Sequence, residues 1–103
     1  MDRIEKIKEM LLANADDSFL KHALGLEYIK LGKEEVARGL FEELLAHDPG
    51  YVGSYYHLAK IFERRGENEQ AIAWYEKGME AAKRAGDRHA LNELTAACEE
   101  LTS

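Results

Sequence analysis

Apolar side chains recur along this chain at steps of three and four residues, the spacing that places them on one side of an α-helix. The first run predicts a helix over residues 2–13, with a buried side formed by Ile4, Ile7, Met10 and Leu11. Short polar or glycine-containing breaks then separate further helices expected over 18–31, 34–47, 52–65 and 68–84. A last helix is expected over 87–101, with an apolar side formed by Ala90, Leu91, Leu94, Ala97, Cys98 and Leu101. The pattern therefore predicts an all-α chain of about six helices.

The middle helices repeat one another at a fixed distance of 34 residues. Corresponding positions hold residues of the same kind: Leu24 and Leu58, Gly25 and Ala59, Tyr28 and Phe62, Gly32 and Gly66, Ala37 and Ala71, Phe41 and Tyr75. Such a period indicates one helical hairpin that occurs twice. We expect a single domain in which the two full units, 18–49 and 52–84, follow a half unit at 2–13 and precede a capping helix at 87–101.

Small residues and helix-breaking residues stand where a helical hairpin needs them. Small side chains allow the two helices of a unit to approach closely, and they are expected at this contact at Gly25, Ala59, Ala37 and Ala71. Gly32 and Gly66 follow the first helix of each unit, where a residue with positive φ ends a helix. Pro49 ends the helix that precedes it, because proline has no backbone N–H.

Polar residues at the breaks predict where two of the helices begin. Either Asp17 or Ser18 is the expected N-cap of the helix over 18–31. Asn68 is the expected N-cap of the helix over 68–84, with Gly66 and Glu67 forming the turn before it.

The order and spacing of Leu24-Gly25, Tyr28, Ala37, Phe41 and Pro49 resemble the tetratricopeptide repeat. The tryptophan position of that pattern holds Lys21 in the first unit and Tyr55 in the second, and the proline position of the second unit holds Lys83. The resemblance implies antiparallel helical hairpins stacked as a right-handed α-solenoid. It also implies a non-enzymatic module that binds another polypeptide in a groove lined by the first helix of each unit.

The groove positions of the two units differ in character. The expected groove residues are His22, Leu26 and Ile29 in the first unit, and Tyr56, His57, Lys60 and Arg64 in the second. Tyr56, Lys60 and Arg64 lie four residues apart, so they form one stripe along a helix. The stripe predicts binding of an acidic or C-terminal peptide. The alternative is a solvated helix face on which the basic groups balance Glu63, Glu67 and Glu69.

The residues at some of the groove positions argue against one known way of binding a partner. Some tetratricopeptide repeat proteins grip a C-terminal carboxylate with Lys and Asn on successive first helices, and the matching positions here hold His22, Leu26 and His57. That carboxylate clamp is absent. A structural homo-oligomer, assembled through the groove or the terminal helices, remains the second hypothesis because two full units bury a small core.

Composition and charge exclude several other classes. A net charge of −6 argues against binding to a nucleic-acid backbone. No apolar run approaches the ~20 residues of a membrane span, and the charged N-terminus and the lone Cys98 favour a cytoplasmic protein.

The sequence predicts no catalytic residues, no metal site and no cofactor. No serine or cysteine stands in a nucleophile motif, and Cys98 falls on an apolar helix side. The four histidines, at 22, 47, 57 and 89, do not pair at the spacing of metal ligands on one helix.

Overall fold

The computed structural model describes residues 2–103, and these residues form six α-helices and no strands. The helices are α1 (Arg3–Ala13), α2 (Ser18–Lys30), α3 (Glu34–His47), α4 (Gly53–Arg64), α5 (Asn68–Ala85) and α6 (Arg88–Thr102). Every predicted helix is present, and each predicted end lies within one residue of the observed end. The expectation of an all-α chain is confirmed.

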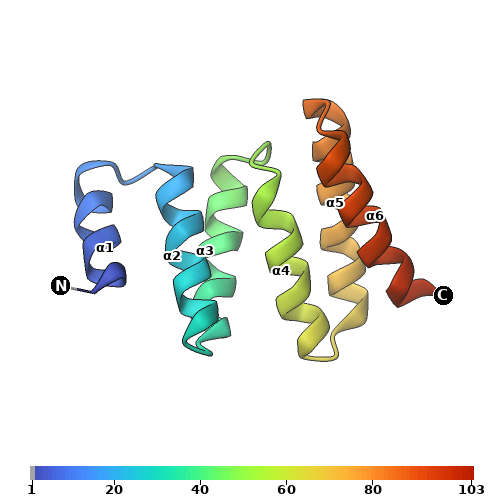
Figure 1. Ribbon diagram of the computed structural model, residues 1–103, viewed down its shortest axis with the longest axis horizontal. Helices are drawn as coiled ribbons and strands as arrows, with labels where there is room; N and C mark the ends of the chain where they lie inside the picture. The colour runs from blue at the N-terminus through green and yellow to red at the C-terminus, as the bar shows by residue number, and fades with distance from the viewer. Residues whose placement is uncertain (1) are drawn as a thin grey trace. The chain divides into compact units, whose positions relative to one another are not determined.

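The helices fall into two compact units. The N-terminal unit ends at Asp48 and contains α1, α2 and α3. The C-terminal unit begins at Pro49 and contains α4, α5 and α6. In each unit one antiparallel hairpin, α2–α3 or α4–α5, packs against the remaining helix (Figure 1). Helix α1 packs on α2, and α6 packs on α5.

Aspartates cap three of the helices. The carboxylates of Asp2, Asp17 and Asp87 accept hydrogen bonds from backbone N–H groups three residues further on, at 2.9–3.0 Å. These bonds satisfy donors that have no partner inside the helix. Of the two candidates for α2, Asp17 is therefore the N-cap, and Ser18 is the first helical residue. The Ser18 hydroxyl instead donates to Asp48, at 2.7 Å.

The turn inside each hairpin is the same tight, glycine-based structure. Gly32 and Gly66 adopt positive φ values of 75° and 76°, as predicted. The residue after each glycine donates its N–H to a carbonyl of the preceding helix, Lys33 to Tyr28 and Glu67 to Phe62, both at 2.9 Å. The turn therefore leaves one linking residue before the next helix. In the C-terminal unit that residue is Glu67, so the prediction that Asn68 is the N-cap of α5 is wrong.

Close contacts between helices occur at the predicted small residues. A Cβ atom placed on Gly25 would lie 2.6 Å from Cζ of Phe41, so α2 can pack on the Phe41 ring only because this side chain is absent. Ala37, Ala59 and Ala71 are completely buried. One expected core residue differs: Met10 is 43% exposed, because Ile7 occupies the centre of the contact between α1 and α2.

Candidate functional site

The predicted stripe on α4 forms a connected group of side chains, which we call the α4 face: Tyr56, His57, Lys60, Glu63 and Arg64. The Lys60 ammonium lies 5.5 Å from the centre of the Tyr56 ring and 3.3 Å from Oε1 of Glu63. Tyr56, Lys60 and Glu63 are half-buried, whereas Arg64 is exposed. Contacts on two sides therefore hold the Lys60 cation in place, beside an aromatic ring.

A residue of helix α5 holds one member of the α4 face in place by a hydrogen bond. The Tyr75 side chain is completely buried, and its hydroxyl donates a 2.7 Å hydrogen bond to Oε1 of Glu63. Burial and the neighbouring carboxylate raise the pKa of Tyr75 well above its usual range, so the phenol stays protonated and remains a donor. Glu63 therefore links the buried Tyr75 to Lys60. The sequence indicated Glu63 only as one balancing charge and gave no sign of its bond to Tyr75.

His57 is an uncharged member of the α4 face at neutral pH. Its ring meets the Tyr56 ring edge-on, with centres 5.6 Å apart. Burial lowers the pKa of His57, the Arg64 charge lowers it further, and Glu93 on α6 opposes the shift. The residue therefore adds a neutral imidazole beside the two cations rather than a third positive charge.

The corresponding surface of α2 is more apolar. His22, Leu26 and Ile29 are half-buried on α2, and the His22 ring meets the Phe41 ring edge-on at 5.7 Å. Phe19 precedes His22 by three residues and Leu26 by seven, so it shares their side of the helix. Its side chain is 65% exposed. The sequence does not point to Phe19 as a surface residue, because an apolar residue in a helix is expected to be buried.

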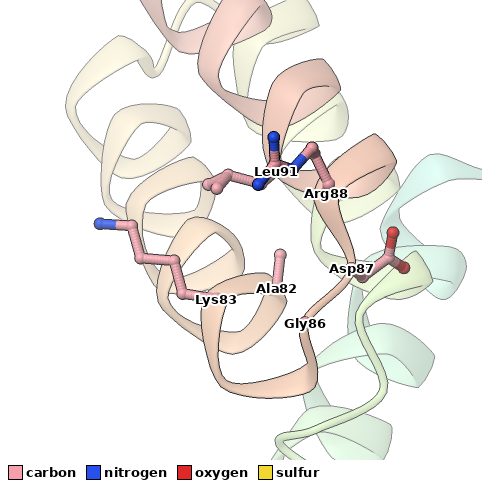
Figure 2. A pocket seen from close by; sticks show the side chains of 6 residues that line it. All are labelled: Ala82, Lys83, Gly86, Asp87, Arg88 and Leu91. Carbon is pink, nitrogen blue, oxygen red and sulfur yellow. The ribbon is translucent and has the colours of Figure 1, made fainter.

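A small pocket lies at the turn between α5 and α6 (Figure 2). Lys83 and Arg88 stand on either side of it, with Ala82 and Leu91 between them. Two of the polar groups at this pocket already have partners in the protein. The Asp87 carboxylate accepts a hydrogen bond from the N–H of Ala90, and the Lys83 ammonium pairs with Glu80 at 3.5 Å. The pocket therefore brings together no set of groups suited to a reaction.

Two residues with nucleophilic side chains, Cys98 and Ser54, are buried. Cys98 is buried, and burial raises the pKa of its thiol. Ser54 is fully buried. In the described part of the chain, no three His, Cys, Asp or Glu side chains are arranged to hold a metal ion. Among the same residues, none of the helices has both the length and the apolar character needed to cross a membrane.

Two glycine-turned hairpins with small residues at their helix contacts define a helical-repeat protein. The profile of the tetratricopeptide repeat family matches residues 22–87. The chain therefore belongs to the tetratricopeptide repeat family, whose fold supports protein–protein interaction and which generally consists of non-enzymatic scaffolds.

Relatives with known sequences or structures agree with this assignment. The chain is 29% identical to the TPR repeat-containing protein PA0015 of Pseudomonas aeruginosa over 89% of its own length and 88% of the relative. It is 41% identical to a tetratricopeptide repeat domain protein from Salinibacter ruber, with a TM-score of 0.80 over 84% of this chain and 96% of that one. Protein BPP2914 from Bordetella parapertussis matches 99% of this chain and 89% of its own, with 25% identity and a TM-score of 0.84.

Proposed function

We propose that this chain is a non-enzymatic cytoplasmic module that binds an extended peptide or a helix of another protein through its α4 face. The main observation is that Lys60 lies between the Tyr56 ring and Glu63. Glu63 is in turn held by a hydrogen bond from the buried Tyr75. Side chains that are already held in place lose little conformational freedom when a partner binds. Tyr and Arg are also enriched among residues that dominate binding energy, which favours Tyr56 and Arg64 as contacts.

The charge of the α4 face favours an acidic partner. Lys60 and Arg64 supply two cations, Glu63 supplies one carboxylate and His57 is neutral at pH 7, so the α4 face carries a positive charge on a chain of net charge −6, with Glu93 of α6 as a neighbouring carboxylate. A local charge opposite to that of the whole molecule selects partners by complementarity. In the N-terminal unit, helix α2 offers a partner a more apolar surface, formed by His22, Leu26, Ile29 and Phe19.

The charge reversal Lys60→Glu with Arg64→Glu tests this function. We expect proteins retained from a lysate by the wild-type chain to be lost with this variant, and their retention to weaken as salt rises. Lys83→Glu with Arg84→Glu is the matched control, because it changes the same charge on exposed residues at the end of α5. Equal retention by both variants, with unchanged helical content, would exclude the α4 face as the binding surface.

A structural homo-oligomer is the second candidate function, and exposed apolar side chains favour it. Among the described residues, the large apolar side chains that are exposed all belong to the N-terminal unit: Met10, Leu12, Phe19, Leu31 and Val36. Scattered exposed residues are ordinary, but a concentration of them is a feature of association surfaces. Light scattering over a concentration series tests this candidate, and a mass that stays monomeric throughout rules it out.

A further inference from the structure

Helices α4 and α6 both pack on α5 in the C-terminal unit. One short turn joins α4 to α5 and another joins α5 to α6, so α4 and α6 run in the same direction (Figure 1). Their side chains meet over Gly78 of α5, because a Cβ atom on this glycine would lie 2.6 Å from the Cβ of Tyr55 and 3.1 Å from Cδ1 of Leu94. A helix with its side chains is about 10–12 Å wide. A partner segment of that width on the α4 face therefore also meets the neighbouring side of α6.

The side of α6 next to the α4 face is acidic. Glu93 and Glu100 are exposed and lie seven residues apart, which places them on one side of the helix, with the small, exposed Ala96 between them. Glu93 lies near the α4 face, since its charge acts on the pKa of His57. We call Glu93, Ala96 and Glu100 the α6 row.

The basic residues of α6 do not cancel the negative charge of the α6 row. Helix α6 has no lysine or arginine after Arg88, and Arg88 lies at the turn, where it lines the small pocket. The imidazole of His89 approaches the row, with its Nε2 3.9 Å from Oε2 of Glu93. This contact offsets Glu93 only when the imidazole is protonated, and it does not involve Glu100. Glu99, which is exposed beside Glu100, adds a further carboxylate.

The α4 face and the α6 row follow the same spacing along two helices that run in the same direction. Corresponding residues are 36 positions apart in the sequence: His57 and Glu93, Lys60 and Ala96, Arg64 and Glu100. On α4 the Glu63 carboxylate pairs with Lys60 and accepts from Tyr75, so Lys60 and Arg64 together leave a net positive charge. The combined surface therefore has a positive edge on α4 and a negative edge on α6.

The two edges limit the charge of a partner. A uniformly acidic segment would bring its carboxylates to Glu93 and Glu100, and a uniformly basic segment would bring its cations to Lys60 and Arg64. Like charges that face each other across an interface cost free energy, which suppresses binding of such partners. A segment with one acidic edge and one basic edge avoids both repulsions.

The spacing of the charges indicates the conformation of the partner. Lys60 and Arg64 are four residues apart, and Glu93 and Glu100 are seven residues apart, or about 10.5 Å at 1.5 Å per residue. A helix places side chains four and seven residues apart on one edge, so it matches both spacings. A strand repeats on one edge about every 6.8 Å, and 10.5 Å falls between its first and second repeats. A helix therefore fits the two edges better than an extended peptide does.

We propose that the partner segment bound at the α4 face is a helix with acidic side chains along one edge and basic side chains along the other. Its acidic edge lies on Lys60 and Arg64, and its basic edge lies on Glu93 and Glu100 of the α6 row. The α6 row acts here together with the α4 face, so the role given to it rests on the function proposed above.

Three alanine-based peptides of about 18 residues, long enough to form an isolated helix, test the charge pattern. The two-edged peptide has four glutamates in one row, spaced i, i+4, i+7 and i+11, and four lysines in a second row displaced by five residues, about 140° around the helix. The mixed peptide has the same composition, with glutamate and lysine alternating within each row. The acidic peptide keeps the glutamate row and has glutamine in place of each lysine.

Binding of the three peptides is followed by the backbone amide NMR signals of the ¹⁵N-labelled chain. We expect a saturable response of α4 and α6 to the two-edged peptide. The mixed and acidic peptides are expected to bind at least about tenfold more weakly, because the first meets like charges on both edges and the second leaves Glu93 and Glu100 without cations.

Reversing the charge of the α6 row separates its role from that of the α4 face. Glu93→Lys with Glu100→Lys should weaken binding of the two-edged peptide about tenfold or more and should strengthen binding of the acidic peptide. Glu76→Lys with Glu80→Lys is the matched control, because it makes the same change of charge on exposed residues of α5. The control should keep the preference for the two-edged peptide over the acidic one. Circular dichroism checks that both variants retain their helical content.

Several results would overturn the role of the α6 row. These are equal affinity for the two-edged and mixed peptides, no saturable response to the two-edged peptide, and an equal loss of preference in the α5 control. A response that follows protein concentration rather than peptide concentration would mean that a second copy of the chain occupies the surface, which also contradicts the proposal.

Failure of the α6 row is distinguishable from failure of the proposed function. If the acidic peptide binds as tightly as the two-edged one and Lys60→Glu with Arg64→Glu abolishes its binding, the α4 face is a site for acidic segments and only the role of α6 is wrong. The proposed function fails instead when this α4 variant still retains the lysate proteins that the wild-type chain retains.

Discussion

The two units share one backbone pattern but use different chemistry at corresponding positions. The N-terminal unit has Phe41 and the apolar Ile29 at the positions that hold Tyr75 and Glu63 in the C-terminal unit, where a hydrogen bond joins the two side chains. On the first helix of each hairpin, the corresponding surface residue changes from Leu26 in α2 to Lys60 in α4. A polar surface group therefore appears together with a buried partner that holds it.

A second set of positions shows compensation in volume. Lys21 and Leu44 in the N-terminal unit correspond to Tyr55 and Gly78 in the C-terminal unit. A Cβ atom on Gly78 would lie 2.6 Å from the Cβ and 3.1 Å from the Cγ of Tyr55, so a longer side chain at this position would run into the base of the tyrosine ring. Because interiors are close-packed, a large residue at one position requires a small one opposite it. The comparison teaches that these positions vary in matched sets and not singly.

Replacing Gly25 by leucine should give the largest effect, because the added side chain meets the Phe41 ring. We expect the free energy of unfolding to fall by about 3 kcal/mol or more, as for severe overpacking. Urea denaturation followed by circular dichroism measures it. Gly39→Leu is the control, since a Cβ at Gly39 meets no atom within 4 Å. Similar losses in both variants would show that the contact between α2 and α3 is not the cause.

Exchanging the Tyr55–Gly78 pair for its N-terminal counterpart tests whether these positions are coupled. Gly78→Leu alone should lower the free energy of unfolding by about 1–3 kcal/mol, because the leucine collides with Tyr55. Tyr55→Lys with Gly78→Leu, made in a Lys77→Glu background that gives the new lysine the partner that Lys21 has in Glu43, should recover part of this loss, with a coupling free energy of about 0.5–3 kcal/mol. A double-mutant cycle measured by urea denaturation decides the matter. Additive losses would contradict the idea of matched sets.

The substitution Tyr75→Phe gives the C-terminal unit the ring of its N-terminal counterpart and removes the hydrogen bond to Glu63. A hydrogen bond to a charged acceptor contributes about 1.5–3 kcal/mol when well buried. Glu63 is half-buried, so we expect a loss of about 1 kcal/mol in thermal or urea unfolding. Phe41→Tyr is the reciprocal variant, and it should also destabilise, because Ile29 offers no acceptor at the corresponding position. Unchanged stability of Tyr75→Phe would contradict the anchoring role.

The smallest expected effect is a pH dependence from His57, whose pKa is lowered in the folded state. Below about pH 6.5 the unfolded chain binds a proton at this position more readily than the folded chain. Stability should therefore fall as the pH drops through this value toward the pKa of the folded state. His57→Gln should reduce this dependence between pH 7.5 and 5. NMR titration of the His57 ring checks the direction of the shift.

The fold could be predicted largely from the sequence because its determinants are local. Gly32 and Gly66 mark turns, and their positive φ follows from the residue type itself. Small residues recur at the repeat distance, Gly25 as Ala59 and Ala37 as Ala71, so the period itself indicates their role in helix contacts. Asn68 was misassigned because the capping position depends on how many residues the turn consumes, which is a property of the folded turn.

The candidate site was less accessible to sequence reasoning. The stripe of Tyr56, Lys60 and Arg64 was visible from its four-residue spacing, and its role as a binding surface stays a prediction. The bond from Tyr75 to Glu63 crosses between two helices and has no sequence signal. The sequence alone shows that Lys21 stands at the tryptophan position of the repeat pattern. Only the structure shows that this lysine is buried and pairs with Glu43 on α3.

The buried thiol of Cys98 allows local unfolding of α6 to be measured by the rate at which the thiol is labelled. Because Cys98 is the only cysteine of the chain and is shielded in the folded state, an external disulfide reagent can reach it only during transient exposure. The labelling rate in excess reagent thus measures how often this part of α6 detaches. Comparing the labelling rate with the rate of global unfolding shows whether α6 unfolds alone or together with α5.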